Sequence, residues 1–129
     1  MIAYKKMGLA MLLVSGLAAC VSMSDGKSIV KTENGMLVSM NNMTVYTFEG
    51  DQVGSGRSSC YGECAMNWPP LLVDQNATSY GDYSIITRDD AKKQFAYKGK
   101  PLYYYRLDKK PDDTNGDNLA NGAWRIVRM

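Results

Sequence analysis

The chain has 129 residues, with 15 Lys and Arg against 13 Asp and Glu, and it contains no histidine. Clustered Lys and Arg are what phosphate binding requires, so this nearly balanced charge gives no reason to expect nucleic acid as a partner. The lack of histidine excludes a zinc site of the histidine type and any Ser-His-Asp triad.

The first twenty residues have the order of a bacterial lipoprotein signal. A basic head at Lys5 and Lys6 precedes an apolar run from Gly8 to Leu17, which is too short to span a bilayer of about 30 Å. Small residues then lead directly into Cys20. We expect cleavage before Cys20 and lipidation of its sulfur; the alternative is an ordinary secretory signal in which this cysteine is incidental.

The signal predicts three segments: a signal peptide over 1–19, a lipidated tether over 20–27 and one β-domain over 28–129. The expected partner of the N-terminus is therefore the membrane, reached through several acyl chains. The expected location is the cell envelope. In a Gram-negative source it is the outer membrane, because Val21 is not the aspartate that retains lipoproteins at the inner membrane.

The β-domain contains two copies of one unit, at about 28–73 and 83–129. Val45–Asp51 matches Leu102–Asp108 at an offset of 57 residues, and Trp68 matches Trp124 at an offset of 56. The same offset of 57 aligns Ile29 with Ile86 and Lys31 with Arg88. A run of matches that ends in the only two tryptophans indicates an internal duplication.

The first copy reads as short strands joined by tight turns. The strands are expected at 28–32, 36–40, 43–49 and 68–73. Asn34-Gly35 is a turn signal, and Asn41-Asn42 suits a two-residue type I′ loop, because asparagine tolerates positive φ. A short helical turn is expected around 59–67.

The second copy repeats this plan, with Lys98-Gly99 at the position of the Asn41-Asn42 loop. Its strands are expected at 83–87, 94–97, 102–107 and 124–127. Many short strands with tight turns are typical of all-β proteins. We predict an all-β, mainly antiparallel fold with short helical turns, forming a small sandwich or barrel from two tandem repeats with approximate two-fold symmetry.

Alternation along the central strands assigns their faces. Tyr46 and Phe48 point to one side, and Tyr103 and Tyr105 match them in the second copy, so this side is the expected core. Asp51 and Asp108 follow just beyond these strands. We expect them to cap the next turn or to accept a hydrogen bond from a backbone amide.

Three motifs together resemble the bacterial lipoproteins described as a secreted repeat of unknown function. The first is Tyr-x4-Asp, present at Tyr46 and again at Tyr103. The second is Cys-x-Gly-x-Cys from Cys60, followed by Trp-Pro-Pro-Leu from Trp68. The third is the loop from Pro111 to Gly116. This resemblance implies a lipid-anchored, repeated envelope domain, and it implies no reaction.

Once lipidation takes Cys20, only Cys60 and Cys64 remain, and in an oxidising compartment such a pair is expected to form a disulfide. A redox role is an alternative interpretation. It would require a thiol of lowered pKa near a base, and the sequence shows no such arrangement.

A copper(I) site is the other alternative that involves sulfur. Across a two-residue Asn41-Asn42 loop, Met40 and Met43 would lie directly opposite each other, with Met36 nearby, and thioethers are soft ligands. No other cofactor is expected. Asp113-x-Asn115-x-Asp117 has the opening of a calcium loop but lacks its glycine and its glutamate, so a solvated turn is expected there.

The sequence shows no nucleophile paired with a base, so we expect a non-enzymatic module that binds another envelope protein or polymer, or has a structural role. One alternative is the copper-binding or redox-linked protein described above. Another is a cell-wall hydrolase that uses Asp51 and Asp108. Tyr104, at the outward position of Tyr103–Tyr105, is a candidate for a tyrosine-bearing binding surface.

Overall fold

The structure is a computed structural model that describes residues 28–129. The expected signal peptide, the tether and Cys20 lie outside these residues. Among the residues that are described, no helix has the length and apolar character needed to cross a bilayer.

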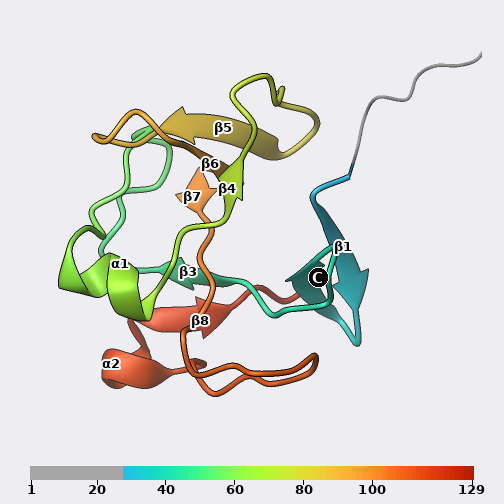
Figure 1. The fold of residues 1–129 in the computed structure, drawn as a ribbon. Coiled ribbons are helices and arrows are strands. Elements are labelled where there is room, and N and C mark those ends of the chain that lie inside the picture. Colours follow the sequence, from blue (N-terminus) through green and yellow to red (C-terminus); the bar gives the residue numbers. More distant parts are fainter. Residues whose placement is uncertain (1–27) are drawn as a thin grey trace, which may run out of the picture.

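Ten short elements form the domain (Figure 1). In chain order they are β1 (Val30–Glu33), β2 (Met36–Ser39), β3 (Tyr46–Phe48), α1 (Glu63–Asn67), β4 (Leu72–Val73), β5 (Tyr83–Thr87), β6 (Lys93–Tyr97), β7 (Lys100–Pro101), α2 (Leu119–Gly122) and β8 (Trp124–Ile126). All strand pairs are antiparallel, in sheets β1-β2, β3-β8 and β4-β6-β5, with β7 paired to β6. The predicted fold class is confirmed, and the small sheets within 28–129 do not close into a barrel.

The two repeats use the same two loop types at exchanged places. The two-residue loops, with positive φ at both positions, are Asn34-Gly35 between β1 and β2 and Lys98-Gly99 between β6 and β7. The predicted two-residue loop at Asn41-Asn42 is wrong. There the Ser39 amide donates to the Met43 carbonyl at 2.8 Å, which closes a three-residue loop with positive φ at Asn42 only.

The matching three-residue loop in the second repeat lies one hairpin earlier, between β5 and β6. The backbone amide of Arg88 donates to the carbonyl of Lys92 at 2.8 Å, and Ala91 takes the positive φ of 71°. This loop corrects the repeat alignment. Val38 and Phe95 match at the offset of 57 residues. Val38 pairs with Lys31, whereas Phe95 pairs with Ile85, so Lys31 corresponds to Ile85 and not to Arg88.

The repeats exchange their final strands. Strand β8 of the second repeat pairs with β3 of the first, in the register Tyr46↔Ile126 to Phe48↔Trp124. Strand β4 of the first repeat pairs in turn with β6 of the second. The final strand of each repeat therefore has its partner strand in the other repeat.

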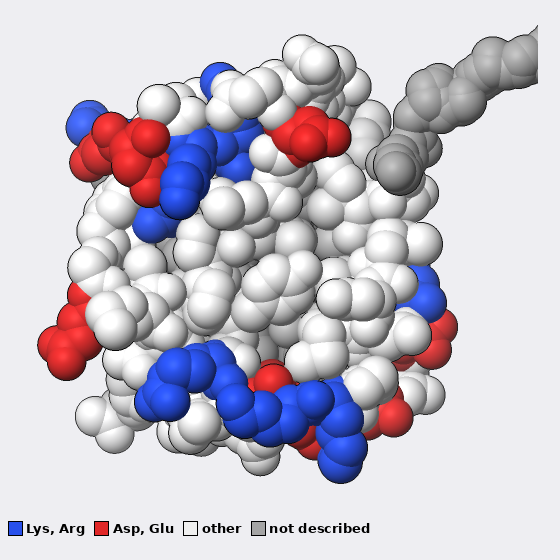
Figure 2. Space-filling model, in the orientation of Figure 1, with Lys and Arg blue, Asp and Glu red and all other residues white. Residues whose placement is uncertain are grey.

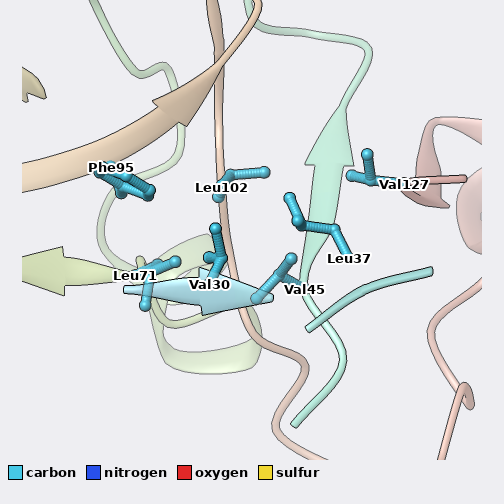
Figure 3. Close-up of a cluster of buried hydrophobic side chains, with 7 residues drawn as sticks. All are labelled: Val30, Leu37, Val45, Leu71, Phe95, Leu102 and Val127. Atoms are coloured by element: carbon cyan, nitrogen blue, oxygen red, sulfur yellow. The ribbon is translucent and has the colours of Figure 1, made fainter. Parts of the chain in front are cut away.

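One hydrophobic core cluster packs between the strands of the two repeats (Figure 3). Its buried members come from both repeats: Val30, Leu37, Val45, Leu71, Phe95, Leu102 and Val127. Val45 and Leu102 are fully buried here, on the side opposite to Tyr46 and Tyr103. The prediction of a single core side is therefore incomplete, because the central strands are covered on both faces.

Candidate functional site

The duplicated tyrosines meet at the centre of the domain. Tyr46 donates its amide to the Tyr103 carbonyl at 2.8 Å, and Tyr103 donates back to the Tyr46 carbonyl at 2.9 Å. Both side chains are fully buried. These two hydrogen bonds join the backbones of the two repeats at the centre of the domain.

Each tyrosine is bonded to the aspartate of the other repeat. The Tyr46 hydroxyl donates to Asp108 Oδ2 at 2.6 Å, and the Tyr103 hydroxyl donates to Asp51 Oδ2 at 2.6 Å. Both carboxylates are buried, with exposed fractions of 5% for Asp51 and 7% for Asp108. The repeat motif thus brings together residues that lie in different repeats, and this reciprocity is not visible in the motif itself.

The second oxygen of each aspartate orders a loop of its own repeat. Asp51 Oδ1 accepts from the Ser59 amide at 2.7 Å, and Asp108 Oδ1 accepts from the Asn115 amide at 2.9 Å. The predicted hydrogen bonds from backbone amides are confirmed. Each carboxylate therefore holds a loop of its own repeat with one oxygen and the central tyrosine of the other repeat with its second oxygen.

A buried cation extends this network in one half only. Arg88, which is 3% exposed, donates to Ser58 Oγ at 3.0 Å, to Gln94 Oε1 at 2.7 Å and to the Cys60 carbonyl at 2.6 Å. Ser58 Oγ lies 2.7 Å from the Tyr103 hydroxyl. Sequence reasoning missed Arg88, Ser58 and Gln94. The connection between β5 and β6 is longer than the matching turn between β1 and β2, and this difference in length is the sequence signal that could have pointed to Arg88.

Burial raises the pKa of both central tyrosines, and their hydrogen bonds to Asp108 and Asp51 raise it further. In the unfolded chain tyrosine ionises near pH 10. Above that pH the unfolded state loses protons that the folded state keeps, so we expect stability to fall as pH rises from about 10. Urea unfolding at pH 8 and pH 11 measures this loss. Equal stability at both values would contradict the prediction.

Tyr103→Phe removes one hydroxyl and leaves the ring. Because a buried charged acceptor loses a donor, we expect the free energy of unfolding to fall by about 1.5–3 kcal/mol in urea titrations. Tyr104→Phe is the matched control, because Tyr104 is the neighbouring tyrosine and packs against the other core cluster, outside the Tyr–Asp network, and it should be near neutral. Equal effects of the two substitutions would show that the hydroxyl of Tyr103 is not needed.

Four aromatic rings stack beside this network and alternate between the repeats. Trp68 and Trp124 are parallel at the centre, with ring centroids 3.8 Å apart. Phe48 stacks on Trp124 and Tyr105 stacks on Trp68, each at 4.3 Å. The two tryptophans that align in the sequence therefore touch in the fold. They bind the repeats together as the hydrogen bonds do.

The disulfide Cys60–Cys64 is present, with an S–S distance of 2.07 Å. It lies beside the aromatic cluster and directly after Ser58 and Ser59. Cys60 also offers its carbonyl to Arg88. The bridge therefore shapes the loop that completes the network of the first half.

The three methionines are not arranged as the copper(I) alternative requires. The bridge Val38↔Thr44 places Ser39, and not Met40, opposite Met43. Met40 lies in the loop and is 49% exposed, and Met36 begins β2 opposite Glu33. The described residues also contain no cluster of three or more His, Cys, Asp or Glu suited to a metal.

The Asp113–Asp117 segment uses its polar groups within the protein. Asp113 accepts from the Lys109 amide at 2.8 Å and from Lys110 Nζ at 2.8 Å, and the Lys110 hydrogen bond lowers the pKa of Asp113. Asp117 accepts from the Ile126 amide at 3.1 Å. The Asp113 carboxylate therefore closes the loop on itself, and the Asp117 carboxylate holds the loop against β8.

The fold and its network define a β-domain of two interlocked repeats. A family model described as a secreted repeat of unknown function matches residues 28–72 and 84–128, and the chain belongs to this family. The resemblance seen in the Tyr-x4-Asp motifs is thereby confirmed, and the family description agrees with an extracellular or envelope location. Neither a curated protein nor a solved structure was found to match the chain.

Proposed function

We propose that this protein is a non-enzymatic binding or structural module of the bacterial cell envelope, held at a membrane by lipid on Cys20. The observation that carries the proposal is that the duplicated motif joins the two repeats to each other. Tyr46 and Tyr103 give their hydroxyls to Asp108 and Asp51, and both pairs are buried. A motif used in this way supports a rigid scaffold that presents a surface.

The same geometry weighs against the hydrolase alternative. A general acid or base must come within hydrogen-bond reach of the proton that it transfers. Asp51 and Asp108 instead have both oxygens occupied by groups of the domain. We therefore assign them a role in holding the repeats together.

One face of the domain suits contact with another macromolecule. In Figure 2 its centre consists of uncharged side chains, while Lys and Arg gather mainly along the lower edge and at the upper left. Interfaces of this kind have a core depleted in charge and a polar rim. This distribution favours a protein or polymer partner.

Metabolic labelling of the full chain with an alkynyl fatty acid, in a Gram-negative host, tests the anchor. We expect label on the mature protein, recovery in the membrane fraction, and loss of the label in Cys20→Ser. Mass spectrometry of the mature N-terminus then identifies the modified residue. An unmodified Cys20 would overturn the anchoring half of the proposal.

Crosslinking in intact envelopes tests the binding half. A photoreactive residue at Leu107, which is 44% exposed, reports contact at the surface without disturbing a buried group. Reporters at Met66 and Leu119, which are also exposed, sample other regions of the surface. We expect at least one reporter to give a reproducible adduct with one envelope component. Absence of an adduct from all three in several growth conditions would count against a binding role.

A further inference from the structure

A groove of about 280 Å³ opens on the outer face of the β3–β8 pair. Thr47 and Arg125 are cross-strand partners on this face, because Phe48 and Trp124, the next pair in the ladder, stack towards the aromatic core. The groove is lined by Thr47, Phe48, Glu49, Asp51, Val53, Lys100, Gly122, Ala123 and Arg125. Its volume is close to the lower end of the range for small-molecule sites.

Close backbone packing fixes the walls of the groove. The Gly54 amide donates to the Gly99 carbonyl at 2.9 Å, and a Cβ at position 99 would lie 2.8 Å from that amide nitrogen. Arg125 donates its Nε to the Gly122 carbonyl at 3.1 Å, and a Cβ at Gly122 would lie 2.8 Å from Arg125 Nη2. The loop that carries Val53 and the guanidinium of Arg125 are therefore held in place.

The other repeat has larger side chains at the equivalent positions. Tyr104 corresponds to Thr47, and Asn67 corresponds to Ala123. Arg106 also donates its Nε to Asn67 Oδ1 at 3.0 Å, so the polar groups there satisfy one another. The groove is thus a feature in which the two halves differ, whereas the Tyr–Asp pairs and the aromatic stack recur in both. A difference of this kind is what a specific site on a duplicated scaffold requires.

Three charged groups around the groove have no protein counter-ion. Within 28–129 the only ion pair is Lys110–Asp113, so Glu49, Lys100 and Arg125 are unpaired there. The Nη groups of Arg125 make no hydrogen bond to the described residues. Arginine presents such groups as a fork that fits a carboxylate. Glu49 supplies the opposite sign to an ammonium.

We infer that this groove binds a small zwitterionic ligand of amino-acid or short-peptide type. Arg125 and Lys100 hold its carboxylate, Glu49 holds its ammonium group, and Val53 contacts its apolar part. This inference rests on the proposed binding function and names a site and a ligand class for it. The pairing of signs favours a zwitterion over a phosphate, because Glu49 and Asp51 would repel a dianion.

Nuclear magnetic resonance titrations of the full domain with three probes test the inference. The probes are the free dipeptide Ala-Ala, its N-acetyl derivative and its C-terminal amide. We expect amide shifts at Thr47, Glu49 and Arg125 that saturate with Ala-Ala. The N-acetyl derivative should bind more weakly, and the amide weakest. Equal shifts with all three probes, or no saturable shift with Ala-Ala, would overturn the inference.

Three variants separate a site from general surface effects. Arg125→Gln should weaken Ala-Ala binding about tenfold or more, because it removes a charged hydrogen-bonding group. Thr47→Tyr, which introduces the residue found at position 104, should block the groove with the fold intact. Arg106→Gln is the matched control in the other repeat and should bind as the parent does. Unchanged binding in both Arg125→Gln and Thr47→Tyr would overturn the site.

Crosslinking in intact envelopes, together with the dipeptide titrations, distinguishes failure of the groove assignment from failure of the proposed function. If envelope adducts persist in Arg125→Gln and the dipeptides do not bind, the module binds elsewhere and only the groove assignment fails. If adducts are absent and the dipeptides bind as described, the groove assignment holds and the macromolecular partner fails.

Discussion

Trp68→Ala is expected to lower the free energy of unfolding by about 3–5 kcal/mol, because it removes a large buried side chain and leaves a cavity. Trp68 is 7% exposed and stacks on both Trp124 and Tyr105. Tyr46 also meets it edge-on, with ring centroids 5.3 Å apart. Small domains are stable by only about 5–15 kcal/mol, so this loss is a large share of the total. Urea unfolding followed by far-ultraviolet circular dichroism measures it.

Trp124→Ala should have a similar effect, because Trp124 holds the equivalent place between Trp68 and Phe48. The double substitution should cost less than the sum of the two, since each tryptophan already loses its partner in the single variants. Leu107→Ala, at a side chain that is 44% exposed, is the control and should change stability by about 0.5 kcal/mol or less. A loss below about 1 kcal/mol in Trp68→Ala would show that the stack does not hold the repeats together.

Local patterns in the sequence predicted most of the strands. Turn chemistry placed the hairpin at Asn34-Gly35, because asparagine and glycine tolerate positive φ, and the repeat placed the hairpin at Lys98-Gly99. The duplicated tyrosines and tryptophans indicated the repeats. The helical turn appeared as α1. These features depend on neighbours in the chain, which a single sequence displays directly.

Such local patterns do not show how the two repeats pair with each other. Nothing in Tyr46-x4-Asp51 says whether the tyrosine bonds its own aspartate or that of the second copy, and the fold selects Asp108. Loop register failed for the same reason at Asn41-Asn42, where the bridge from Val38 to Thr44 adds a residue to the loop. Tertiary contacts decided both outcomes.

Arg88 shows how this limits the prediction of a site. A charged residue in a hairpin loop is usually solvated, and its burial depends on acceptors from distant segments. Here they come from Ser58, Cys60 and Gln94, which only the fold brings together. The groove at Thr47 could not be predicted either, because it is lined by residues that only the fold brings together: Thr47 of β3, Gly122 of α2 and Arg125 of β8.

Cutting the chain within the exposed segment 74–82 is expected to abolish folding of either half alone. The first half would keep β3 and β4 without their partners β8 and β6. It would also leave the carboxylate of Asp51 without the Tyr103 hydroxyl. The heteronuclear magnetic resonance spectra of fragments 28–78 and 79–129 should therefore each show the narrow dispersion of amide signals that is typical of an unfolded chain. Dispersed signals from either fragment alone would contradict the exchange of strands.

Mixing the two fragments should restore the fold, because every contact between repeats can form without the connecting segment. Each fragment carries one tryptophan, so stacking of Trp68 on Trp124 provides a near-ultraviolet signal that only the complex can give. The fragment pair should be less stable than the intact chain, since association now costs the freedom of two molecules. A 28–78 fragment carrying Trp68→Ala is the control and should bind weakly. Recovery with this control equal to the parent would mean that the interlocked strands, without the stack, suffice to join the halves.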